Sequence, residues 1–235
     1  MRACSAFMVL LVVLPLTACG KPKSATSSTA PSKAARASHE PAATESAEVA
    51  PDSKPTTSKI ERRDVAGFTL GDYLPPLDGG RIEIATPDGW KPMPRDSKYV
   101  VRFTELDSGG GLPRIDVVVE ENKLGGFTDV TESNVADFTA AVAKELKANG
   151  TAVIETPIPM VIGSVPCARY VSHLKLQIGV GTILVERQTL ALLHAGRLYK
   201  IDLLVTLNKL TESRDAAYAV CSGLRFPDVE SPATE

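Results

Sequence analysis

Two hydrophobic patterns alternate along this chain and predict strands and helices. Ile82 and Ile84, and then Ile115, Val117 and Val119, alternate with polar residues, as in strands that have one face in water. Turn residues follow the first of these strands at Thr86-Pro87-Asp88-Gly89-Trp90. Further strands are expected over residues 99–106, 152–156, 167–176, 182–194 and 198–206, the last two joined by a tight turn at Ala195-Gly196.

Helical spacing occurs in two places. One helix has an apolar stripe made of Val135, Phe138, Val142 and Leu146. Thr131 or Ser133 can cap its start, and Asn149-Gly150 ends it. A terminal helix is expected over 211–222, with Gly223 just past its end. Strands, a helix, a run of strands and a final helix predict an α+β fold, an antiparallel sheet flanked by helices.

The N-terminus has the features of a secretory signal. Arg2 is followed by an apolar stretch from Phe7 to Leu16, which is shorter than the roughly 20 residues of a membrane-spanning helix. Leu16-Thr17-Ala18-Cys19 resembles the lipobox of bacterial lipoproteins, in which lipid is attached to the Cys sulfur and a peptidase cuts before it. We therefore expect a signal peptide over 1–18 and lipidation of Cys19. The alternative is a plain secreted protein with an incidental cysteine.

Composition divides the rest of the chain. Residues 19–59 are rich in Ser, Thr, Ala and Pro with almost no large apolar residue, which predicts a disordered tether behind the lipidated cysteine. A single α+β domain is expected over 60–228, followed by a flexible tail over 229–235. From residue 61 onward, 24 acidic residues face 19 basic ones, which argues against a nucleic-acid partner. The expected location is a cell membrane or outer membrane, lipid-anchored and facing the periplasm or exterior.

Three segments resemble the Mog1/PsbP-like family, which includes PsbP proteins and bacterial lipoproteins of the DcrB type. These are the strand and turn over 82–90, the small-residue strand over 163–170 and the helix with its following residues over 216–226. The resemblance implies an α/β/α sandwich. The family has no shared catalytic centre, so the resemblance implies a binding or assembly role and assigns no site residue.

Four cysteines are present, of which Cys4 lies in the expected signal peptide and Cys19 is the lipidation site. The remaining pair, Cys167 and Cys221, would meet an oxidising compartment, which favours a disulfide between the strand after the long helix and the terminal helix. Two buried free thiols are the alternative, because cysteine is among the most buried residue types.

No pattern of catalytic, metal-binding or cofactor-binding residues is found. His39, His173 and His194 are far apart in the sequence and have no metal-ligand spacing. There is no Gly-x-Ser-x-Gly elbow or phosphate loop; Gly179-Val180-Gly181 is expected to be a β-turn. The only tryptophan, Trp90, is expected to close the core.

Acidic residues on the predicted strands are the remaining candidates. Asp116, Glu120 and Glu121 can share a face with Glu83 or Glu105 and bind Ca²⁺ or act as acid and base. A solvated strand face explains them as well.

The sequence therefore predicts a non-enzymatic, membrane-tethered binding or assembly module without cofactors. Its partners would be membrane lipid, through Cys19, and an envelope protein. The alternative is a small-molecule- or ion-binding lipoprotein that serves a transporter or envelope enzyme. An exposed apolar patch would favour the first function, and a cavity with convergent polar groups would favour the second.

Overall fold

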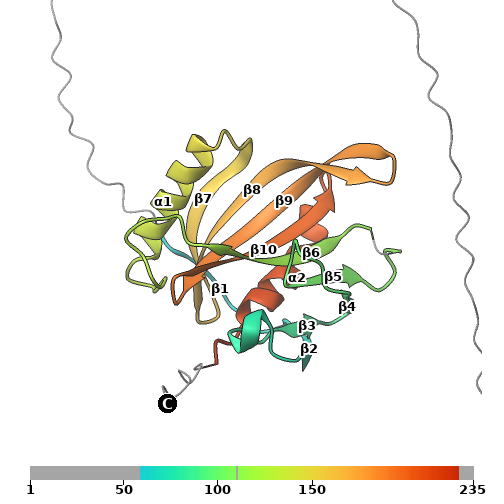
Figure 1. Ribbon diagram of the computed structural model, residues 1–235, viewed down its shortest axis with the longest axis horizontal. Coiled ribbons are helices and arrows are strands. Elements are labelled where there is room, and N and C mark those ends of the chain that lie inside the picture. Colours follow the sequence, from blue (N-terminus) through green and yellow to red (C-terminus); the bar gives the residue numbers. More distant parts are fainter. Residues whose placement is uncertain (1–58, 110, 228–235) are drawn as a thin grey trace, which may run out of the picture. The chain divides into compact units, whose positions relative to one another are not determined.

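The computed structural model describes residues 59–109 and 111–227, which contain two sheets and two α-helices (Figure 1). The larger sheet has eight strands in the order β1-β7-β8-β9-β10-β6-β5-β4, and β2 and β3 form the smaller one. All strand pairs are antiparallel except β1 with β7. None of the helices in these residues is long and apolar enough to cross a membrane.

The elements follow one another along the chain in the order of their numbers. The strands are β1 (Glu61–Arg63), β2 (Leu70–Tyr73), β3 (Ala85–Pro87), β4 (Trp90–Met93), β5 (Val101–Glu105), β6 (Arg114–Glu121), β7 (Val153–Ile162), β8 (Val165–Ile178), β9 (Gly181–His194) and β10 (Arg197–Thr206). The helices are α1 (Val135–Ala148) and α2 (Leu210–Ser222), with a short 3-10 turn, η1, at Asp78–Gly80.

The large sheet lies between the two helices. Alternate residues of a strand point to opposite faces, so β8 sends Cys167 and Val171 into one core cluster and Ala168 and Tyr170 into another. The first cluster includes side chains of α2, and the second includes side chains of α1. We name the two sides of the sheet the α2 face and the α1 face. This layering confirms the predicted α+β fold with an antiparallel sheet flanked by helices.

Helix α1 has the predicted stripe, but its start differs from the prediction. Neither Thr131 nor Ser133 caps the helix; their hydroxyl oxygens lie 2.9 Å apart and bond to each other. The N-cap residue is Asn134, whose side chain accepts a hydrogen bond from the backbone of Thr131 and so closes the preceding turn. The predicted end is confirmed: the φ of Gly150 is +64°, the left-handed conformation that glycine adopts without strain.

The central strands are longer than the sequence predicts. The strand expected over 152–156 continues to Ile162 as β7, through Pro157 and Pro159. These prolines are accommodated because the β7–β8 register is irregular between Glu155 and Ile158, and β1 pairs only with residues 160–162. The turn at Ala195-Gly196 is confirmed, with positive φ at both residues.

The region before β5 differs most from the prediction. Ile82 and Ile84 are fully buried, as their spacing suggests, but residues 82 and 83 form isolated bridges to Leu77 and Arg225 rather than a regular strand. The turn predicted over 86–90 is confined to Asp88-Gly89, and Trp90 begins β4. The predicted role of Trp90 is confirmed, because it is 9% exposed and belongs to the core.

Helix α2 is fixed to the sheet by an ion-pair cluster and by a close contact after its end. Glu155 on β7 lies 2.5 Å from Arg169 of β8 and 3.3 Å from Arg214 of α2. A Cβ at Gly223 would lie 2.6 Å from the side chain of Leu70, so only glycine fits there without a shift.

Candidate functional site

A row of polar side chains crosses five strands on the α1 face. Strand register places Arg102 opposite Asp116, Asp116 opposite Asp202, Asp202 opposite Thr189, and Thr189 opposite Tyr170. We call these five residues the polar row. Tyr170 lies on β8 and packs in the α1 cluster, and α1 packs mainly on β7 and β8, whereas the other four residues lie on β9, β10, β6 and β5. The row therefore extends beyond the part of the sheet that α1 covers.

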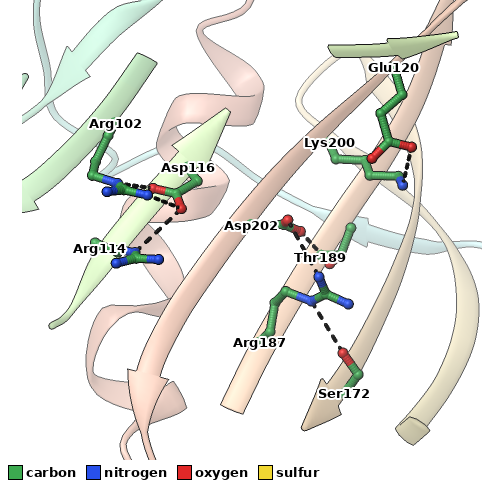
Figure 2. Close-up of polar contacts among 9 residues, drawn as sticks. All are labelled: Arg102, Arg114, Asp116, Glu120, Ser172, Arg187, Thr189, Lys200 and Asp202. Atoms are coloured by element: carbon green, nitrogen blue, oxygen red, sulfur yellow. Dashed lines mark hydrogen bonds and ion pairs between the residues drawn. The ribbon is translucent and has the colours of Figure 1, made fainter. Parts of the chain in front are cut away.

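The first end of the polar row is an ion pair. Arg102 donates from Nε and Nη2 to the two carboxylate oxygens of Asp116, at 2.5 and 2.7 Å, and Arg114 Nε lies 3.4 Å from Asp116 (Figure 2). Asp116 is only 8% exposed. A carboxylate so removed from water requires this pairing, because an unpaired buried charge is very costly.

The middle of the row surrounds Asp202. Thr189 Oγ1 donates to Asp202 Oδ1 at 2.5 Å, and Arg187 Nη1 lies 3.9 Å from Asp202 Oδ2. Burial raises the pKa of Asp202, although Arg187 and Thr189 oppose that effect. Burial also raises the pKa of Tyr170 to about 12. Asp202 therefore holds its proton more strongly than an exposed aspartate does.

A cavity of about 400 Å³ lies beside this part of the row. The apolar residues that line it include Val142 and Leu146 of α1 together with Leu124 and Leu198, and the polar ones include Arg187 and Asp202. Ligand pockets in proteins commonly have volumes of roughly 300–1,000 Å³ and combine apolar walls with a few polar groups. The cavity has the size and the chemistry of a small-molecule site.

A second exposed feature is the end of the β8–β9 hairpin. Pairing of β7 with β8 ends at Ser172, and pairing of β10 with β9 ends at Val185, so the remainder is a two-stranded ribbon (Figure 1). We call residues 178–184 the hairpin tip. Its turn lies at Gly179-Val180, as the sequence predicts. Four large apolar side chains of the tip are exposed: Ile178 (45%), Val180 (fully), Ile183 (37%) and Leu184 (43%).

The two cysteines of the described residues lie side by side in the core of the α2 face. Cys167 and Cys221 are fully buried and are free thiols in the structure, so the predicted disulfide is not formed in it. A hydrogen bond between the thiols and their burial raise the pKa of Cys221 well above its ordinary value. The predicted proximity of the pair is present, and the bond between them stays a prediction.

The remaining predicted candidates are dispersed. Cys19, the signal peptide over 1–18, the tether apart from Lys59, and His39 lie outside the described residues, as does the tail over 229–235. His173 is exposed on β8, whereas His194 stacks on Phe226 at 4.1 Å with Nδ1 3.2 Å from Asp129. In the part of the chain that the structure describes, no group of three or more His, Cys, Asp or Glu residues is placed to hold a metal ion.

The acidic residues that the sequence suggested as a shared site do not all lie together in the fold. Asp116 and Glu120 lie on the α1 face, where Glu120 pairs with Lys200 at 2.7 Å (Figure 2), and Glu121 lines the cavity. Glu83 and Glu105 do not join them: Glu83 pairs with Arg225 through backbone bonds, and Glu105 is an exposed residue opposite Trp90.

Sequence reasoning missed Arg102, Arg187 and Asp202. One signal was available for Asp202, which interrupts the apolar run from Ile201 to Val205. A lone acidic residue in a strand buried on both faces indicates a specific partner.

The fold and site define a class: an α+β module with a mostly antiparallel eight-stranded sheet between two helices and a partly open polar face. No protein-family model and no curated protein matches the chain. The chain is similar to three solved structures, described next.

The first is a protein from Bacteroides thetaiotaomicron (13% identity, TM-score 0.45), matched over 69% of this chain and 51% of that one, so this chain spans about half of it. The second is cyanobacterial PsbP from Synechocystis, with 14% identity and a TM-score of 0.38, matched over 67% of this chain and 97% of that one. The third is LpqN, involved in cell envelope biogenesis of Mycobacterium tuberculosis, with 14% identity and a TM-score of 0.39. It is matched over 61% of this chain and 81% of that one. Similarity at this level does not establish a family or a function, and membership of the Mog1/PsbP-like family stays a prediction.

Proposed function

We propose that this chain is a non-enzymatic binding module that is anchored by lipid on Cys19 to a cell membrane or outer membrane, faces the periplasm or exterior, and binds an envelope protein through its hairpin tip. The observation that carries the proposal is the set of four large apolar side chains exposed at that tip. The sequence Leu16-Thr17-Ala18-Cys19 and the tether composition support the anchor.

The tip has the chemistry of a protein contact. Ile183 lies opposite Leu176 and Leu184 lies opposite Lys175, so apolar side chains occupy both faces of the ribbon. Isolated exposed apolar residues need no explanation, but four of them within the short hairpin tip indicate a contact site. The ribbon also has strand edges without neighbours in the sheet, which can pair with a partner strand.

The test is site-specific photo-crosslinking in native cells. A photoreactive amino acid at Val180 is expected to give a discrete protein adduct, whereas the same group at Lys144, exposed on α1, gives none. Val180→Asp with Ile183→Asp should abolish crosslinking from Leu184. The matched control, Lys175→Asp with Gln177→Asp, changes two exposed polar residues of the same ribbon that are not cross-strand partners and should keep the adduct. Equal adduct formation in both double variants would refute contact through the apolar tip.

The cavity beside the polar row favours a second candidate function, the binding of a small molecule. Its volume of about 400 Å³ and its combination of apolar and polar lining residues are the specific observations. This candidate predicts saturable binding of an amphipathic molecule by the full chain. Leu146→Trp, which places a larger side chain in the cavity wall, should weaken that binding without affecting crosslinking at Val180.

A further inference from the structure

We infer that the cavity binds a small organic acid, with the carboxylate held by Arg187 and the apolar body lying against α1. The inference rests on the second candidate function and names its ligand class. Three observations carry it: the unused donors of Arg187, the fixed position of Asp202, and the apolar residues that line the cavity.

Arg187 has no carboxylate oxygen within hydrogen-bond distance, unlike Lys200 and Arg102 on the same face. Lys200 lies 2.7 Å from Glu120, and Arg102 donates twice to Asp116. Arg187, in contrast, donates one hydrogen bond, from Nε to Ser172 Oγ at 3.3 Å, and its nearest carboxylate oxygen is 3.9 Å away (Figure 2). A guanidinium has five N–H groups, so most of those of Arg187 are unused.

Asp202 forms its hydrogen bond with Thr189 and not with Arg187, although both residues lie on β9. Its Oδ1 accepts the short bond from Thr189, and its Oδ2 remains beyond hydrogen-bond distance of Arg187. The side chain of Arg187 is 24% exposed and lines the cavity. Its free N–H groups are therefore available to a ligand that enters there.

The other residues that line the cavity favour a carboxylate over a phosphate as the bound anion. A carboxylate matches the planar guanidinium fork and can accept two parallel hydrogen bonds. Glu120, Glu121, Glu145 and Asp202 also line the cavity, against three basic residues, so a doubly charged phosphate would meet more repulsion than a singly charged carboxylate. The aliphatic side chains of Val142 and Leu146, which also line the cavity, would contact an apolar body.

The experiment compares three probes of matched size: 3-phenylpropionate, 3-phenylpropan-1-ol and 3-phenylpropylamine. Isothermal titration calorimetry is carried out on the full chain in lipid nanodiscs, with empty nanodiscs as the reference. One charge-assisted hydrogen bond corresponds to about a tenfold gain in affinity or more, so the carboxylate should bind at least about tenfold more tightly than the alcohol. The amine should bind no better than the alcohol.

Arg187→Gln should lower the affinity for the carboxylate to that for the alcohol and leave alcohol binding unchanged. The matched control, Lys175→Gln, removes a positive charge from an exposed position on β8 and should change neither affinity. A carboxylate preference that survives Arg187→Gln would overturn the role of Arg187.

The probe comparison on the unmodified chain needs no variant. If alcohol and carboxylate bind equally well, the ligand class is wrong and the small-molecule site stands. If none of the three probes binds, both the ligand class and the second candidate function fail. Neither result bears on the proposed protein contact at the hairpin tip, which photo-crosslinking tests separately.

Discussion

The contact between Cys167 and Cys221 makes a strong prediction about stability. Oxidation of this pair would close a loop of about 55 residues between β8 and α2. In the chain-entropy account, a loop of this length lowers the entropy of the unfolded chain enough to stabilise the fold by about 4 kcal/mol at 25 °C. We therefore expect the oxidised chain to exceed the reduced chain in free energy of unfolding by about 2–5 kcal/mol, the usual range for native bridges.

The expected time of bond formation also follows from the structure. The thiolate is the form that attacks a disulfide, and the raised pKa of the buried Cys221 suppresses it in the folded protein. The bond should accordingly form during folding, before α2 covers the pair. Protein that folds under reducing conditions should oxidise slowly afterwards.

The assay is urea unfolding of protein purified from its own compartment, with and without dithiothreitol, alongside mass spectrometry of non-reduced peptides. The control is a variant with Cys167→Ala and Cys221→Ala, whose unfolding should not respond to the reductant. Two thiols that alkylate in the purified, denatured protein would refute the bridge. Equal stability of the wild type with and without reductant would refute the magnitude.

Three further predictions concern the anchor, the pH dependence and the packing of α2. Cys19→Ala should abolish labelling by a fatty-acid analogue; equal label on the variant would exclude lipidation at that cysteine. Burial of Glu155 is outweighed by its two arginine partners, which lower its pKa, so its contribution to stability is present above pH 4.5 and is lost as pH falls below that value. Unfolding free energies between pH 3 and 6 should therefore fall more for the wild type than for Glu155→Gln. Gly223→Ala should lower the unfolding free energy by only about 1 kcal/mol or less, because the new methyl group overlaps the end of the flexible Leu70 side chain, which can move, and alanine lowers the entropy of the unfolded chain; Gly125→Ala, at an open position, is the control for thermal unfolding.

Local patterns predicted the elements that depend on local interactions. The apolar stripe of α1 and the Ala195-Gly196 turn could be recognised, since helical periodicity and turn conformation are properties of neighbouring residues. Strands β1, β2 and β4 were missed because each has three or four residues and acquires its extended form from a partner distant in sequence.

The candidate site was less predictable for the same reason. Asp116 was noted as an acidic residue on a strand, but nothing near it in the sequence indicates that Asp202 lies opposite it. Arg187 reads as an ordinary charged strand residue until the fold places it beside the cavity. A site built across five strands depends on register, which a single sequence does not display.

The polar row also has a consequence for how the sheet assembles. A strand that slipped by two residues would keep its apolar face inward, so burial alone does not distinguish the shifted sheet from the native one. The slip would, however, separate Asp116 from Arg102 and move Asp202 away from Thr189, so the hydrogen bonds of both carboxylates to these partners would be lost. The polar row thus favours the native strand register over shifted registers that bury a similar apolar surface. Replacing Arg102 and Asp116 together by leucine should cost little stability, yet amide NMR spectra should then show more than one set of strand resonances.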